Sequence, residues 1–158
     1  MASFPLLLLL LLPAVAGLLL TLLSSWQPRQ LAWIAAGACL GQLVVGLVCA
    51  IHPPDDLHLS WVPKLGLELQ LGVDGLSLPL VVLTALISAA AILFAPSDQP
   101  RPRLFFSLLL ATNLGVMGAF LARNALLFLL AFELVLIQPP CWWRSGAASG
   151  ERAPPFAF

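Results

Sequence analysis

The sequence predicts an all-α membrane protein: a bundle of transmembrane helices with a small β-hairpin outside the membrane. Hydrophobic residues make up 61% of the 158-residue chain and charged residues 9%, and the mean hydropathy is +1.02. Soluble domains carry about 25% charged residues. The apolar residues also fall into runs near the length of about 20 residues that a membrane-spanning helix needs. Net charge is zero and no basic block is present, which argues against a nucleic-acid partner.

Five apolar runs define the expected helices. They cover residues 4–23, 31–51, 75–95, 104–121 and 125–137. The first four are long enough for full transmembrane helices, whereas the fifth is too short and reads as a truncated helix. Residues 14–16 resemble a signal-peptide cleavage site, but no Lys or Arg precedes the first run. We therefore expect an uncleaved first helix, bent or loosened at Pro13.

Basic residues indicate the orientation, since Lys and Arg are enriched on the cytoplasmic side. With the N-terminus outside, the cytoplasmic segments hold Arg29, Arg101, Arg103, Arg144 and Arg152, and the outer segments hold only Lys64 and Arg123. The N-terminus is therefore predicted to lie outside. Apolar and polar residues alternate along the outer segment 57–73, on both sides of Pro63 and Lys64, which predicts a β-hairpin.

Small residues predict where helices approach closely. Gly37 and Gly41 form a G-x-x-x-G pair in the second run, and Ala111, Gly115 and Ala119 follow at intervals of four in the fourth. This spacing lets helix backbones come together in membranes.

The other candidate sites have structural interpretations. Asp74 precedes the third run and is expected to cap that helix. Arg123 and Asn124 form an interfacial turn in which Arg can reach the headgroups. The outer segment also contains His52, Asp55, Asp56 and His58, but their spacing matches no zinc pattern, so no metal is expected. The three cysteines, Cys39, Cys49 and Cys141, show no C-x-x-C spacing and predict neither a disulfide framework nor a zinc site.

Glu133 is the main candidate for a functional residue. It lies in the fifth run, nine residues after Asn124, or about 14 Å at helical rise, near the middle of the bilayer. A carboxylate at that depth costs a few kcal/mol or more and requires a protein or water environment. Proton relays use such residues, and a hydrogen bond to a neighbouring helix is the structural alternative.

Two segments resemble a known family. Residues 72–80, Gly-Val-Asp-Gly-Leu-Ser-Leu-Pro-Leu, are similar to a motif that opens the third helix of antiporter-like subunits of type I NAD(P)H–quinone oxidoreductase (complex I). Residues 132–137, Phe-Glu-Leu-Val-Leu-Ile, resemble that family's fifth-helix motif. The resemblance is strongest to the chain 4 (subunit M) type, particularly the cyanobacterial form, and covers residues 1–137.

The resemblance implies a role in proton translocation. The fifth-helix glutamate of the family, here Glu133, acts as a proton relay and charge partner to a seventh-helix lysine. The redox cofactors and the quinone site lie in other subunits, so no cofactor is expected in this chain. The expected partners are other membrane-arm subunits and the lipid bilayer. The expected location is the bacterial inner membrane or the cyanobacterial thylakoid membrane.

The segment 138–158 departs from the family, since the chain ends before the partner lysine and Gln138 stands where the motif has proline. Because Trp has a single codon, Cys141-Trp142-Trp143 in a shifted frame encodes Leu and Val. With suitable neighbouring codons, that frame continues as Leu-Leu-Val-Ala-Ile-Trp-Gly-Gly, an apolar helix half. We therefore expect 138–158 to be a frameshifted, disordered tail, and residues 1–137 to be the N-terminal part of the transmembrane domain.

The predicted function is that of an N-terminal fragment of a proton-translocating quinone-oxidoreductase subunit, with no catalysis by this chain alone. Two other classes stay open. Multi-subunit cation/proton antiporters share the fold and the glutamate motif, and neighbouring genes would distinguish them. A non-functional membrane fragment is the second alternative.

Overall fold

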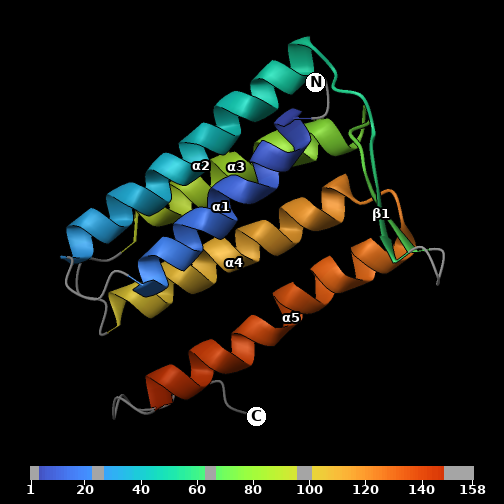
Figure 1. Ribbon diagram of the computed structural model, residues 1–158. Coiled ribbons are helices and arrows are strands. Elements are labelled where there is room, and N and C mark those ends of the chain that lie inside the picture. Colours follow the sequence, from blue (N-terminus) through green and yellow to red (C-terminus); the bar gives the residue numbers. More distant parts are fainter. Residues whose placement is uncertain (1–3, 23–26, 63–66, 96–100, 148–158) are drawn as a thin grey trace.

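The computed structural model describes residues 4–22, 27–62, 67–95 and 101–147. Five helices and two strands occur within these ranges (Figure 1). The helices are α1 (Phe4–Leu22), α2 (Pro28–Ile51), α3 (Ser77–Leu93), α4 (Pro102–Leu121) and α5 (Ala125–Ala147). The strands are β1 (Leu57–Val62) and β2 (Leu67–Leu71). The expected helical membrane fold with an added hairpin is confirmed.

The first four helices form a closed bundle. α1 packs on α2 and α4, and α3 packs on the same two helices from the other side. α5 lies outside this group, alongside α4 (Figure 1). The first four helices therefore cover one another, and α5 is covered mainly on the side that faces α4.

Two apolar clusters fill the bundle. One includes Leu20, Leu31, Ile92 and Phe106, near the end where α2 and α4 begin. The other includes Leu6, Val81, Met117 and Leu121 at the opposite end, together with Leu71 from the hairpin. Leu71 is 1% exposed, so the hairpin contributes to the core as well as covering the end of the bundle.

The structure confirms the β-hairpin that the alternating sequence pattern predicted. β1 and β2 pair antiparallel, with Leu57 opposite Leu71 and Leu59 opposite Leu69. Side chains on one face of a strand recur every second residue, and Leu57, Leu69 and Leu71 all pack against the second apolar cluster. The turn around Pro63 and Lys64 lies outside the described residues.

The third helix is shorter than predicted. α3 has 17 residues. The apolar run 75–95 predicted a helix of 21 residues that crosses the membrane completely. The ends of that run form a capping turn and a terminal turn around Phe94. Among the described residues, α1, α2 and α4 are the helices long and apolar enough to cross a membrane, three in place of the expected four.

The fifth helix is longer than predicted. It was expected to end at residue 137, but α5 continues to Ala147 and passes through Pro139 and Pro140. Inside a helix, proline removes a hydrogen-bond donor and its ring crowds the carbonyl group four residues earlier, at a cost of about 3 kcal/mol. The structure continues the helix over residues 138–147, where the sequence analysis expected the start of a disordered tail, and the remaining residues 148–158 lie outside the described part of the chain.

Candidate functional site

α4 and α5 approach closely through glycine. A Cβ atom on Gly115 would lie 2.7 Å from Val135 Cγ2 and 3.0 Å from the Ala131 carbonyl oxygen, both on α5. A Cβ on Gly118 would lie 3.1 Å from the Ala131 Cβ. The sequence correctly identified Gly115 as a packing position. By contrast, a Cβ on Gly37 would meet nothing within 4 Å, so half of the predicted G-x-x-x-G pair makes no close contact here.

This packing fixes which way Glu133 faces. Ala131 and Val135 point at α4, and Glu133 lies two residues from each. At about 100° per residue, two residues correspond to about 200° around the helix. Glu133 therefore lies on the side of α5 directed away from α4, and it is exposed.

Apolar side chains surround Glu133 on that uncovered side. Within about 60° of Glu133 around the helix axis are four exposed leucines: Leu126, Leu129, Leu130 and Leu136. We call Glu133 and these four leucines the outer face of α5. Glu133 forms no hydrogen bond or ion pair with any residue in the described ranges, so the alternative of a hydrogen bond to a neighbouring helix is not realised within them.

Asp74 caps the turn that leads into α3, which begins at Ser77 with Leu76 directly before it. Its Oδ1 accepts hydrogen bonds from the backbone N–H groups of Ser77 (2.7 Å) and Leu76 (3.1 Å), and its own N–H donates to Ser77 Oγ (2.9 Å). These reciprocal bonds are those of a capping box. The Ser77 backbone and hydroxyl bonds hold the pKa of the Asp74 carboxyl below its ordinary value, and Arg123 contributes in the same direction.

Arg123 anchors the α4–α5 connection to the hairpin. Its Nη2 lies 3.4 Å from Asp56 Oδ1 and donates to the Val73 carbonyl at 3.4 Å. Two backbone hydrogen bonds also link the hairpin to the end of α4. The Arg123 N–H donates to the Gln70 carbonyl and the Gly72 N–H donates to the Leu121 carbonyl, each at 2.9 Å. Both ion-pair side chains are about 40% exposed, so the pair itself contributes about 0–1 kcal/mol. The backbone bonds therefore hold this junction.

Gly72 lies directly beneath the ion pair at this junction. A Cβ there would meet Asp56 Oδ1 and Arg123 Nε, but both atoms belong to half-exposed side chains that can move aside. Asn124 completes the turn by accepting the Leu126 N–H at its Oδ1 (3.0 Å), which caps α5. The predicted interfacial turn is thus also the point where the hairpin is attached.

The outer segment does not assemble a metal-ligand cluster in the described ranges. His52, Asp55, Asp56 and His58 are all exposed, and Asp56 is committed to Arg123. Cys39 and Cys49 are free and buried in the bundle. The expected absence of a metal remains a prediction, since only part of the chain is described.

Sequence reasoning missed a buried polar pair between α2 and α4. Gln42 and Asn113 are 0% and 2% exposed. Gln42 Nε2 donates to the Leu9 carbonyl of α1 at 2.8 Å, and Asn113 Nδ2 donates to Gln42 Oε1 at 2.5 Å. The signal was present in the sequence, because each is an uncharged polar residue near the centre of a long apolar run, where such residues join helices.

No protein-family model matches the chain. Curated relatives do match it. The chain is 38% identical over 136 residues to NAD(P)H-quinone oxidoreductase chain 4 of Gloeobacter violaceus, a match that covers 80% of the chain and 25% of the relative. It is 36% identical over 146 residues to the chain 4 proteins of Prochlorococcus marinus (strain MIT 9303) and Synechococcus sp. (strain WH7803), covering 86% of the chain and 26% of each relative. The chain thus spans about a quarter of the length of these relatives.

Proposed function

We propose that this chain, a fragment similar to NAD(P)H-quinone oxidoreductase chain 4, forms the N-terminal part of a subunit that moves protons across a membrane as quinone is reduced. The relatives' shared name and the helical membrane fold support this role. The two motifs that suggested it also occupy distinct structural positions, one at the capped start of α3 and one in the middle of α5.

The apolar surroundings of Glu133 on the outer face of α5 support a functional role for its carboxylate. An ionised carboxylate among exposed leucines, in the middle of a membrane helix, costs at least about 2–3 kcal/mol unless protein or water surrounds it. The described residues supply no such partner. The relatives are about four times as long as the matched region, and a whole subunit of that length has further helices to cover this face.

In the covered site, Glu133 would hold and release a proton at its carboxylate oxygens. A lysine on a covering helix, as the family resemblance implies, would stabilise the ionised form by its positive charge. Loss of that charge from the vicinity would favour protonation. Glu133 thus acts as a proton relay and charge partner whose occupancy follows the state of its neighbour.

The proposed partners of this chain are other membrane-arm subunits. The redox cofactors and the quinone site are proposed to lie in those other subunits. Arg29, Arg101 and Arg103 lie at the end of the bundle where α2 and α4 begin, and Asp55, Asp56 and Asp74 lie at the hairpin end. By the positive-inside tendency, the arginine end is cytoplasmic and the N-terminus is outside. The proposed membrane is the bacterial inner membrane or the thylakoid membrane.

Substitution of Glu133→Gln in the whole subunit, assembled in its complex, tests the relay role. The amide keeps size and hydrogen-bonding capacity but cannot ionise, so proton translocation should fall by about tenfold or more. Assembly, judged by the subunits that co-purify, should be nearly unchanged. Proton uptake by membrane vesicles after addition of the electron donor measures the effect.

Asp55→Asn is the matched control, since it removes one carboxylate from an exposed position outside the membrane span and outside the ion pair of Arg123. It should leave proton translocation close to that of the unmodified complex. Pumping by the Glu133→Gln form at the control level would reject the relay role. The antiporter alternative predicts cation/proton antiporter genes beside this one, whereas the proposed function predicts quinone-oxidoreductase genes.

A further inference from the structure

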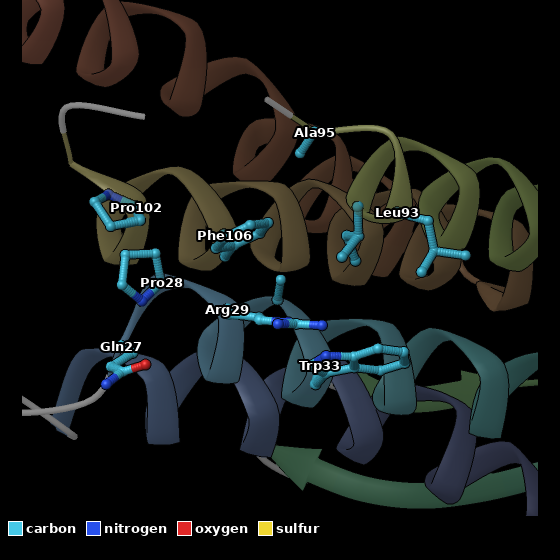
Figure 2. Close-up of a pocket in the computed structure, with 10 residues that line it drawn as sticks. Gln27, Pro28, Arg29, Trp33, Leu93, Ala95, Pro102 and Phe106 are labelled. Carbon is cyan, nitrogen blue, oxygen red and sulfur yellow. The ribbon is translucent and has the colours of Figure 1, made fainter. Parts of the chain in front are cut away.

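A cavity of about 550 Å³ opens between three helix ends, at the end of the bundle opposite the hairpin. This size falls within the range of about 300–1,000 Å³ that ligand pockets occupy. Side chains from the start of α2, the end of α3 and the start of α4 line it. Figure 2 shows Pro28, Arg29 and Trp33 of α2 on one side, with Pro102 and Phe106 of α4 and Leu93 of α3 across from them.

The cavity has one cationic group on a mostly apolar wall. Ile92, Leu93 and Phe106 are apolar, while Arg29 supplies the positive charge. Arg29 is exposed and has no hydrogen bond or ion pair to any part of the chain that the structure describes. Its five N–H donors are therefore available to a ligand, and the planar guanidinium matches the geometry of phosphate oxygens.

Among the described residues at this end of the bundle, the other charged side chains are also positive. Arg101 and Arg103 stand at the beginning of α4, on the same end of the bundle but outside the cavity lining. Two helices begin at the cavity and one ends there, so their dipoles partly offset one another. The described charges at the cavity are therefore positive, which favours an anion over a zwitterion.

Position relative to the membrane selects the kind of anion. The lining residues sit in the end turns of α2 and α4, two helices long and apolar enough to span a bilayer, and so lie at headgroup depth. Trp33 is 64% exposed, and tryptophan at that depth marks the interface between lipid and water. A ligand that places an anionic group at this depth and also contacts the apolar side of the cavity needs a hydrocarbon portion.

We propose that this cavity binds an anionic phospholipid, with the phosphate at Arg29, the glycerol region beside Trp33 and the start of an acyl chain along Leu93 and Phe106. The site is built by α2, α3 and α4 and does not involve Glu133 or α5. It would fix the three helix ends relative to one another through a bound lipid, and it is independent of the role proposed for Glu133.

Lipid titration of the purified full chain tests the assignment. The chain in a neutral detergent receives phosphatidylglycerol or phosphatidylcholine with identical acyl chains, and native mass spectrometry counts the bound lipid. We expect tighter binding of phosphatidylglycerol. Arg29→Gln should weaken that binding by about fivefold, the effect of one basic group near a membrane surface, whereas Arg29→Lys should retain most of it.

Arg103→Gln is the matched control, because it removes the same charge from the same end of the bundle without touching the cavity lining. It should leave phosphatidylglycerol binding within about twofold, since an exposed charge outside the site acts through screened solvent. Equal losses in the two glutamine variants would overturn the proposal in favour of diffuse attraction. Equal binding of the two lipids, or full displacement of phosphatidylglycerol by soluble glycerol phosphate, would also overturn it.

Discussion

At the scale of single residues, Gln42 and Asn113 show how polar groups are accommodated inside this bundle. They lie between the two apolar clusters, at about the middle of α2 and α4. The Asn113 amide donates to Gln42, but the buried Asn113 Oδ1 has no partner within the described residues. A hydrogen bond between membrane helices contributes about 0.6–2 kcal/mol, and a buried polar group left without one costs a similar amount or more.

A double-mutant cycle measures this coupling. Gln42→Leu should destabilise the chain by about 1–2 kcal/mol, because it leaves the buried Asn113 amide with only the weak Cys39 Sγ acceptor at 3.7 Å. Gln42→Leu with Asn113→Leu should cost less than the sum of the two single changes, by about 1 kcal/mol, since neither polar partner remains. Equilibrium unfolding in mixed micelles gives the four free energies. Strict additivity would show that the two amides do not interact.

Local sequence predicted some residue roles and not others. The capping role of Asp74 was readable because a cap depends on residues within one turn, here Ser77 and Leu76. The pairings of Asp56 with Arg123 and of Gln42 with Asn113 join positions 67 and 71 residues apart. Such contacts depend on the rotation and depth of separate helices, which a single sequence pattern does not specify.

At the scale of elements, the apolar runs located every helix, while the ends shifted for local reasons. α2 begins at Pro28 and α4 at Pro102, each before its predicted start, because proline is well tolerated in the first turn of a helix. α3 is shortened by its own caps. The small residues predicted close packing in general, but only the structure distinguishes Gly115, against α5, from Gly37, in open space.

Gly115→Ala should separate α5 from α4. The new methyl group would lie 2.7 Å from Val135 Cγ2, and such overpacking costs about 1–3 kcal/mol. Because α5 packs mainly on α4, we expect the loss to appear as faster hydrogen exchange in residues 125–136. Gly37→Ala is the matched control, with the same change in a helix where nothing lies within 4 Å. Exchange in α5 that is equal in both variants would contradict this account of the contact.

At the scale of the whole molecule, the helices α1 to α4 pack on one another, whereas α5 packs mainly on α4 alone. The helix continues to Ala147, yet Pro139 and Pro140 lack the donors that would bond the carbonyl groups of residues 135 and 136. We propose that 138–158 does not belong to the family and follows a change of reading frame. The relatives match 80–86% of the chain, which leaves an unmatched share comparable with that segment.

Sequencing of the gene across the Ile137 codon tests the reading frame. We expect the neighbouring frame to continue as an apolar helix, Leu-Leu-Val-Ala-Ile-Trp-Gly-Gly or a near relative, and then through the rest of the subunit. A lysine on a later helix should follow, where it could face Glu133. An uninterrupted reading frame through residue 158, with no apolar helix encoded in the neighbouring frame, would contradict the proposed frameshift.

The sequence by itself determined the membrane class, the approximate positions of the five helices, the presence of the hairpin and the identity of Glu133 as the unusual charge. These follow from local hydrophobicity and periodicity, which act over one helix or strand at a time. Only the tertiary structure decided that Glu133 faces away from α4, that Gln42 meets Asn113, and that Arg29 lines a cavity between three helix ends. Those features depend on how separate helices rotate and align, and that is set by packing across the whole bundle.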